Sequence, residues 1–177
     1  TWERDRVIDF SFSYGSTGTR LLTKRGNKYW DPKSLVNLRI GALAKTTNEQ
    51  VIRTIQPKAE IVLLKDRAEG FAALRSGKID AFASDGILLE SWLQNAPDRQ
   101  NWQIVGDYSF EGIACMVPEN NSQFLNTVNY TLTKFMQGVL DEQPEGVAIF
   151  EQWFGPQGAL PLTQDLKNIM IDNMQLL

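Results

Sequence analysis

The 177-residue chain contains no histidine and only one cysteine. Without histidine, the Ser/His/Asp and Cys/His nucleophilic arrangements are excluded, and so are the usual zinc ligand sets. Cys115 has no second cysteine for a disulfide, and its apolar neighbours in residues 112–117 predict a small buried side chain. We therefore expect no metal site and no catalytic residue of these kinds, and nothing in the composition points to a cofactor.

The sequence also lacks long apolar runs and an excess of either charge. No run approaches the roughly 18 residues of a membrane span, and the first residues have neither a starting methionine nor the pattern of a signal peptide. Lys and Arg total 18 against 21 Asp and Glu, without long charged blocks, which argues against a nucleic-acid-binding surface. The composition is typical of a soluble globular protein with one or two domains, and the chain is expected to be a mature polypeptide or a fragment of one.

Strand-like and helix-like segments alternate through the middle of the chain. The strand-like runs are residues 38–43, 60–64 and 79–83. A helical pattern follows each run, and two of these patterns begin with the spacing of a capping box, Thr46 with Glu49 and Asp66 with Glu69. Repeated strand, helix, strand predicts right-handed crossovers and a parallel sheet.

The last third of the chain is helical in pattern. Residues 122–137 carry apolar side chains at intervals of three and four, which predicts one face of a long helix. Two shorter helical patterns follow, around residues 149–154 and 166–177, and residues 155–158 form a loop between them.

Three polar turns follow the predicted strands. They are Thr46-Thr47, Asp66-Arg67 and Ser84-Asp85-Gly86. A parallel sheet presents ligands to the loops at the carboxyl ends of its strands, so these turns are expected to gather at one edge. Free N–H groups beside Thr46 and Thr47 would suit a carboxylate, and the alternative is ordinary N-capping.

Charged residues near these turns have two interpretations each. Arg67 lies in the first turn of a helix, where a cation opposes the helix dipole. It is either a ligand-binding residue or a solvated arginine whose cost Asp66 and Glu69 offset. Asp85 is either an N-cap or a carboxylate aimed at a cation, and both can hold at once. Arg4, taken alone, would be assigned to a surface charge.

Several short motifs follow one another in a fixed order. They are Glu3-Arg4, Asp9-Phe10-Ser11, residues 18–24, residues 35–41, Thr46-Thr47, residues 77–82, Asp85, Val105-Gly106 and Gln152-Trp153-Phe154-Gly155. This order, from residue 1 to about residue 155, resembles the family 3 extracellular solute-binding proteins, the amino-acid-binding components of bacterial ABC importers. Residues 18–24, 101–106 and 112–116 are most similar to the glutamate/aspartate-binding members.

The resemblance implies an α/β fold with two lobes, the type II periplasmic-binding-protein fold, with only the second lobe complete in this chain. The two strands that cross between lobes would be about residues 21–24 and 113–117. The implied domains are the end of lobe 1 with the first crossing strand (1–22), lobe 2 (23–115), and the return to lobe 1 with the C-terminal helices (116–177).

The resemblance also implies a ligand site. The family's α-carboxylate clamp falls on Arg4, whose guanidinium can donate two parallel hydrogen bonds. Thr46 and Thr47 would add hydroxyl and amide donors, Asp85 would bind the ammonium group, and Arg67 would contact the side chain of an acidic amino acid. The expected ligand is therefore glutamate or aspartate.

The resemblance leaves one part of the family fold unaccounted for, because the family's first segment is absent from this chain. The apolar helix residues that would then need a partner are Phe124, Val128, Phe135, Phe150 and Trp153. We expect that the chain is a truncated or proteolysed form, or that it self-associates to cover these residues.

The expected partners are a free amino acid and the membrane subunits of an ABC permease, in the periplasm or outside the cell. Two other functions stay open. One is the ligand-sensing domain of a receptor. The other is an enzyme similar to cyclohexadienyl or arogenate dehydratases, in which Glu111 would donate a proton instead of being a loop carboxylate.

Overall fold

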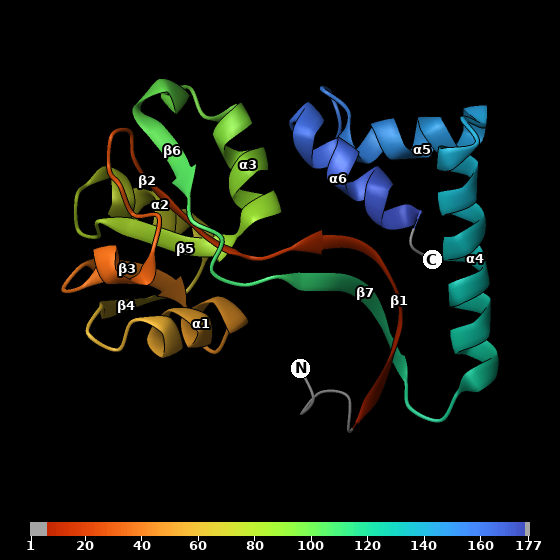
Figure 1. Ribbon diagram of the computed structural model, residues 1–177, viewed down its shortest axis with the longest axis horizontal. Coiled ribbons are helices and arrows are strands. Elements are labelled where there is room, and N and C mark those ends of the chain that lie inside the picture. Colours follow the sequence, from red (N-terminus) through yellow and green to blue (C-terminus); the bar gives the residue numbers. More distant parts are fainter. Residues whose placement is uncertain (1–6, 176–177) are drawn as a thin grey trace. The chain divides into compact units, whose positions relative to one another are not determined.

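The computed structural model describes residues 7–175, which form two compact units (Figure 1). Unit 1 is built from residues of Thr1–Ser16 and Glu111–Leu177, and unit 2 from Thr17–Phe110. Unit 2 is therefore one continuous segment between the two parts of unit 1. Within residues 7–175, every helix is too short or too polar to cross a membrane.

Unit 2 contains a five-stranded sheet in the order β4-β3-β5-β2-β6. The strands are β2 (Thr19–Lys24), β3 (Arg39–Leu43), β4 (Glu60–Leu64), β5 (Ala81–Asp85) and β6 (Trp102–Val105). β3 is parallel to both β4 and β5, so parallel pairing is confirmed for the three predicted strands. The sheet as a whole is mixed, however, because β2 is antiparallel to β5 and to β6.

Helices follow three of these strands in unit 2. They are α1 (Thr47–Ile55), α2 (Arg67–Arg75) and α3 (Gly86–Asn95), with short 3₁₀ turns at Pro32–Leu35 and Arg99–Asn101. Both predicted caps are confirmed. The Thr46 hydroxyl accepts a hydrogen bond from the Glu49 N–H, and the Asp66 carboxylate accepts one from the Glu69 N–H.

The strand predicted at residues 79–83 begins two residues later and ends at Asp85. The backbone N–H groups of Lys78 and Ile79 donate to the carbonyl of Ala73, which keeps both residues in the turn after α2. Asp85 is thus the last residue of a strand, and α3 starts directly after it.

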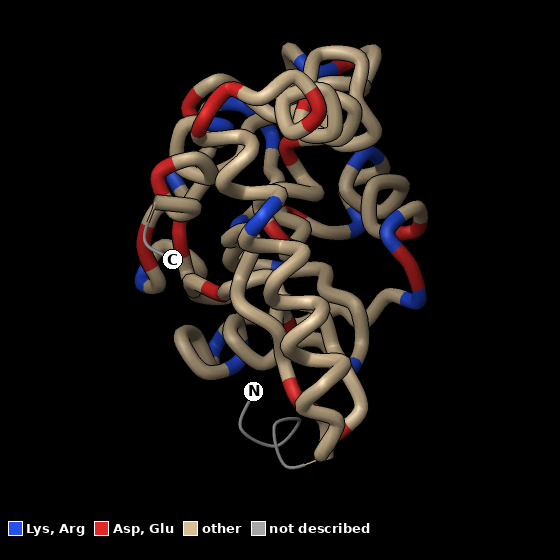
Figure 2. The backbone as a smooth tube through the Cα atoms, turned by 90° about the vertical axis from the view of Figure 1, so that its right-hand side faces the viewer, with Lys and Arg blue, Asp and Glu red and all other residues tan. Residues whose placement is uncertain are grey.

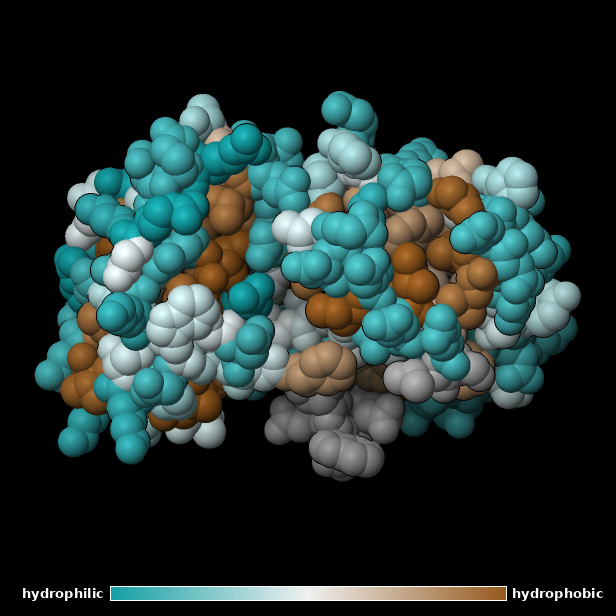
Figure 3. Space-filling view, turned by 45° about the horizontal axis from the view of Figure 1, so that its top comes forward, coloured by the Kyte–Doolittle hydropathy of each residue, from teal (hydrophilic) through white to brown (hydrophobic). Residues whose placement is uncertain are grey.

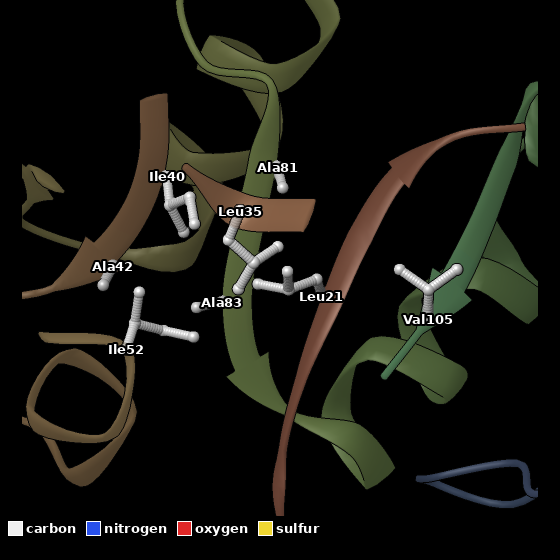
Figure 4. Close-up of a cluster of buried hydrophobic side chains, with 8 residues drawn as sticks. All are labelled: Leu21, Leu35, Ile40, Ala42, Ile52, Ala81, Ala83 and Val105. Atoms are coloured by element: carbon white, nitrogen blue, oxygen red, sulfur yellow. The ribbon is translucent and has the colours of Figure 1, made fainter. Parts of the chain in front are cut away.

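Buried side chains form one cluster on each face of this sheet. The cluster in Figure 4 consists of Leu21, Leu35, Ile40, Ala42, Ile52, Ala81, Ala83 and Val105. The second cluster consists of Leu22, Leu64, Ala73, Leu74, Ile79, Phe82, Leu89 and Trp102. Neighbouring strand residues such as Leu21 and Leu22 fall in different clusters because side chains alternate across a strand. Hence α1 covers one face, and α2 and α3 cover the other (Figure 1).

The predicted domain limits fall after residues 22 and 115, whereas unit 2 begins at Thr17 and ends at Phe110. The difference arises from β2, which the family resemblance implied to be a crossing strand. Leu21 pairs with Ala83 of β5 and with Val105 of β6, so β2 is an interior strand of the sheet in unit 2. That each unit corresponds to one lobe stays a prediction.

The described residues of unit 1 form a two-stranded sheet and three helices. The elements are β1 (Ile8–Thr17), β7 (Glu111–Pro118), α4 (Ser122–Leu140), α5 (Pro144–Phe154) and α6 (Gln164–Met174). The predicted long helix at residues 122–137 is confirmed and extends to Leu140. Lys134 is the one charged residue of α4 (Figure 2).

Apolar side chains are exposed on unit 1, and apolar surface patches are visible in Figure 3. Phe124 and Trp153 are 47% and 51% exposed, in line with the prediction that these residues lack a partner. Phe150 differs, because its ring lies 5.2 Å from that of Phe154 and only 4% of the residue is exposed. Cys115 is half-buried instead of buried, because β7 belongs to a sheet of only two strands.

Tyr108 provides a pH-dependent test of this fold. Its hydroxyl donates a 2.6 Å hydrogen bond to the Tyr29 carbonyl. Burial raises the pKa of Tyr108 to about 12, with smaller contributions from Asp31 and Asp107. A tyrosine whose pKa rises on folding contributes stability that is complete below its unfolded pKa of 10.0 and is lost as the pH rises towards 12. Urea denaturation at several pH values should show a smaller loss over this range for Tyr108→Phe than for the wild type. Equal losses would contradict the assignment.

Candidate ligand-binding site

The three polar turns leave the sheet of unit 2 at one edge. β3 and β4 are parallel and in register, with Leu43 opposite Leu64, and β5 is parallel to β3 on its other side. The carboxyl ends of all three strands therefore coincide. This arrangement places the turns that carry Thr47, Arg67 and Asp85 on the same edge, as predicted.

Thr46 and Thr47 have different roles at the start of α1. The Thr46 hydroxyl donates a 2.7 Å hydrogen bond to the Leu43 carbonyl and accepts one of 3.3 Å from the Glu49 N–H, so it acts as the N-cap. Among residues 7–175, the Thr47 hydroxyl and the backbone N–H groups of Thr47 and Asn48 have no hydrogen-bond acceptor. These three donors point out of the first turn of the helix and are available to an anion.

Lys45, directly before the two threonines, adopts a left-handed conformation with φ of 62°. Its backbone N–H, one residue before the N-cap, donates a 2.7 Å hydrogen bond to the Glu49 carboxylate, which ties Lys45 to the first turn of α1. Glu49 is also bound at 2.9 Å by the Arg53 guanidinium, and this contact, together with the Lys45 N–H, lowers the pKa of Glu49. Glu49 is therefore an ionised structural residue at neutral pH.

Arg67 and Asp85 face each other across the edge. The Arg67 Nη2 lies 4.0 Å from Asp85 Oδ2, and the two side chains are 48% and 25% exposed. Asp85 occupies the N-cap position of α3 but makes no side-chain cap hydrogen bond. Of the two interpretations of Asp85, the structure thus favours a carboxylate that faces a cation over a helix cap.

A buried polar cluster, which the sequence did not predict, connects this edge to β2. The Thr19 hydroxyl donates a 2.8 Å hydrogen bond to the Asn48 side-chain oxygen, and the Ser109 hydroxyl donates one of 3.1 Å to the Thr19 hydroxyl. Thr19 is also the residue opposite Asp85 in the β2–β5 pairing. The cluster joins the first turn of α1 to β2 at the position opposite Asp85. It therefore holds α1 and the end of β5 in place relative to each other.

Two residues named in the sequence analysis remain, Arg4 and Glu111. Arg4 is outside the described residues, so its role stays a prediction. Glu111 is the first residue of β7 in unit 1, which places it in a strand instead of a loop. Within residues 7–175, no three acidic or sulfur-bearing side chains come together in a way that could hold a metal ion.

We compared the chain with known proteins. No family model matches it. It is 28% identical to an L-glutamate/L-aspartate-binding protein of Pseudomonas aeruginosa, over 95% of this chain and 58% of the relative. It is 29% identical to a glutamate/aspartate import solute-binding protein of Escherichia coli, over 86% of this chain and 50% of the relative. It is 32% identical to the ABC transporter glutamine-binding protein GlnH of Bacillus subtilis, over 86% of this chain and 54% of the relative.

Two solved structures of amino-acid-binding proteins are similar in fold to this chain. An ancestral arginine-binding protein bound to arginine has a TM-score of 0.73 and 26% identity, over 88% of this chain and 68% of that one. The ancestral amino acid-binding protein AncCDT-1, a precursor of cyclohexadienyl dehydratase, has a TM-score of 0.72 and 25% identity, over 86% of this chain and 64% of that one.

The fold is that of a two-lobe α/β solute-binding protein, and this chain spans about half the length of the curated relatives that it matches. The chain is a relative of the amino-acid solute-binding proteins of ABC importers, and this confirms the resemblance found in the sequence. The three curated relatives described above are binding proteins, not enzymes.

Proposed function

We propose that the protein binds a free acidic amino acid and delivers it to an ABC importer. The observation that carries this proposal is the meeting of Arg67, Asp85 and the open first turn of α1 at one edge of unit 2. An acidic amino acid carries one ammonium group and two carboxylates. The edge offers one carboxylate, one guanidinium and a set of uncommitted N–H and O–H donors, which is the complementary set of charges.

Each group of the ligand has a proposed partner. Asp85 accepts hydrogen bonds from the α-ammonium group, because its carboxylate is not used in capping α3. The α-carboxylate accepts hydrogen bonds from the Thr47 hydroxyl and from the N–H groups of Thr47 and Asn48, where the helix dipole also favours an anion. Arg4 is proposed to bind the same carboxylate, as the family resemblance implies. Arg67 is proposed to bind the carboxylate of the ligand's side chain.

The distance between Arg67 and Asp85 suits a ligand that replaces their mutual contact with one contact to each residue. At 4.0 Å and with both side chains partly exposed, the pair is a weak one, of the kind worth about 0.2–1 kcal/mol. A ligand that gives Arg67 a carboxylate and Asp85 an ammonium group forms two charge-assisted contacts in place of one. The loss of the internal pair is therefore a small part of the free energy of binding.

The cellular setting follows from the relatives and belongs to the proposal. We place the protein in the periplasm or outside the cell, with the membrane subunits of an ABC permease as its partner and with no catalytic step. The direct test is calorimetry of the full-length protein with glutamate, aspartate, glutamine and arginine. Binding of arginine alone, with neither acidic amino acid bound, would overturn the proposed specificity.

A substitution at Arg67 tests the assignment of the ligand side chain. Arg67→Gln removes one charge-assisted hydrogen bond to the distal carboxylate, which is expected to weaken glutamate binding by about 10- to 100-fold. Binding of glutamine, which has no second charge, should change by much less. Arg99→Gln, at an exposed arginine in another turn of unit 2, is the matched control. Equal losses for glutamate and glutamine would show that Arg67 does not read the side chain.

A further inference from the structure

Arg20 of β2 has a largely enclosed side chain that connects two elements of unit 2. Its Nη1 lies 3.3 Å from Glu90 Oε1 on α3. Its Nε donates a 3.0 Å hydrogen bond to the Gly106 carbonyl, in the turn after β6, and lies 3.2 Å from Asp107 Oδ1. The side chain is only 23% exposed, and burial raises the pKa of its partner Glu90. One guanidinium therefore ties the first turns of α3 to the end of β6.

The alkyl part of Arg20 covers the residue that follows Asp85. A Cβ atom at Gly86 would lie 2.7 Å from Arg20 Cδ, so glycine is the residue that allows this approach. The Gly86 N–H donates a 2.9 Å hydrogen bond to the Gly18 carbonyl, and Asp85 itself lies opposite Thr19 in the strand pairing. The backbone on both sides of Asp85 is thus held by residues 18–20.

The Asp85 carboxylate depends on this support. It makes no cap hydrogen bond to α3, and its one charged partner among the described residues, Arg67, is 4.0 Å away. Its position at the edge is therefore set by its backbone, and so by the elements that hold the strand-to-helix turn. A small shift of the first turn of α3 would move the carboxylate away from a ligand's ammonium group.

We propose that Arg20 is a positioning residue for ligand binding, one that fixes Asp85 for the ammonium group without touching the ligand. This inference rests on the proposed function of the site. Arg20 is not proposed as a second ligand arginine, because its Nε already contacts Gly106 and Asp107 and its Nη1 contacts Glu90. It acts through the backbone of Gly86 and through α3.

Amide hydrogen exchange tests the positioning role without any ligand. Arg20→Met keeps a chain of similar length and removes the guanidinium. We expect the Gly86 amide to exchange about tenfold faster or more in this variant, with core amides of β3 unchanged. Arg39→Met is the matched control, since Arg39 is also a strand arginine with a partly buried carboxylate partner, Asp80, but lies at the opposite end of the parallel strands. Unchanged exchange at Gly86, or an equal change in Arg39→Met, overturns the proposal.

Calorimetry of the full-length protein supplies the functional test. Arg20→Met should weaken glutamate binding about tenfold in the wild-type background and less than twofold in an Asp85→Asn background, because the two changes act on one contact. Arg20→Lys, which keeps a positive charge near Glu90, should recover part of the loss. Additive effects of the two substitutions overturn the proposal. If the wild type binds no amino acid, the proposed function fails, and the exchange experiment alone decides the role of Arg20. If Arg20→Met does not fold, Arg20→Lys is used in both experiments, with smaller changes in the same direction as the expected result and no change as the result that overturns the proposal.

Discussion

Replacing Asp85 with asparagine is expected to weaken glutamate binding by about 100-fold or more. The substitution removes the carboxylate proposed to face the ammonium group in a site that is partly shielded from water, and truncating one partner of such a charge pair costs about 2–5 kcal/mol. The fold should survive, because the Asp85 side chain makes no cap hydrogen bond and is 25% exposed. The free energy of unfolding should change by no more than about 0.5 kcal/mol. Calorimetry and urea denaturation measure the two quantities.

Two controls make the Asp85 experiment specific. Asp172→Asn removes the same charge from an exposed position on α6 and should leave binding unchanged. Glutarate, which is glutamate without the amino group, should lose little affinity in Asp85→Asn. If glutarate and glutamate lost affinity equally, Asp85 would not be the ammonium ligand.

The second large effect concerns the core of unit 2. Phe82→Ala is expected to lower the free energy of unfolding by about 3–5 kcal/mol, because the residue is fully buried and its removal leaves a cavity. Phe82 lies in β5, and its ring meets that of Phe71 on α2 edge to face at 5.3 Å between centroids. Urea denaturation followed by circular dichroism would measure the loss, and a change below about 1 kcal/mol would contradict the packing described here.

A substitution at Gly70 of α2 tests the packing of α2 against the Phe82 ring. A Cβ atom there would lie 2.6 Å from Phe82 Cε2, so Gly70→Ala should destabilise unit 2 by about 1–3 kcal/mol through overpacking. Phe82→Leu removes the ring atoms that would clash. The double substitution should therefore be less destabilised than the sum of the single ones, and a purely additive result would place the two residues out of contact.

Local patterns in the sequence predicted the elements that carry the site. Thr46 and Asp66 were identifiable as caps because each is followed three residues later by a glutamate. The edge location of Arg67 and Asp85 followed from the strand–helix order alone, since parallel strands end together. The hydrogen bonds of Thr46 confirm it as the N-cap, and Thr47 is the first residue of α1.

Features built from distant residues could not be predicted. The pairing of β2 with β5 and β6 joins Leu21 to residues that lie far along the chain, and no local pattern records it. Arg20 meets Glu90 across 70 positions, and Ser109 meets Thr19 across 90. The start of β5 was misplaced because Lys78 and Ile79 have strand-like neighbours but give their N–H groups to the end of α2. The contacts of Leu21, Arg20 and Ser109 are tertiary, whereas the turn after α2 is a local hydrogen-bonding alternative that the residue types there leave open.

The position of β2 also has a consequence for folding kinetics. It is the first strand of unit 2 to be synthesised, yet its partners β5 and β6 are the third and fourth strands to follow it. Until they emerge, Leu21 and Leu22, which are fully buried in the native state, have no strand to pair with. Pairings over long sequence separations are slow to form, and unpaired apolar strands are prone to aggregate. During synthesis β3, α1 and β4 therefore emerge before either strand that pairs with β2, and the pairing positions of β2 stay unfilled over that interval.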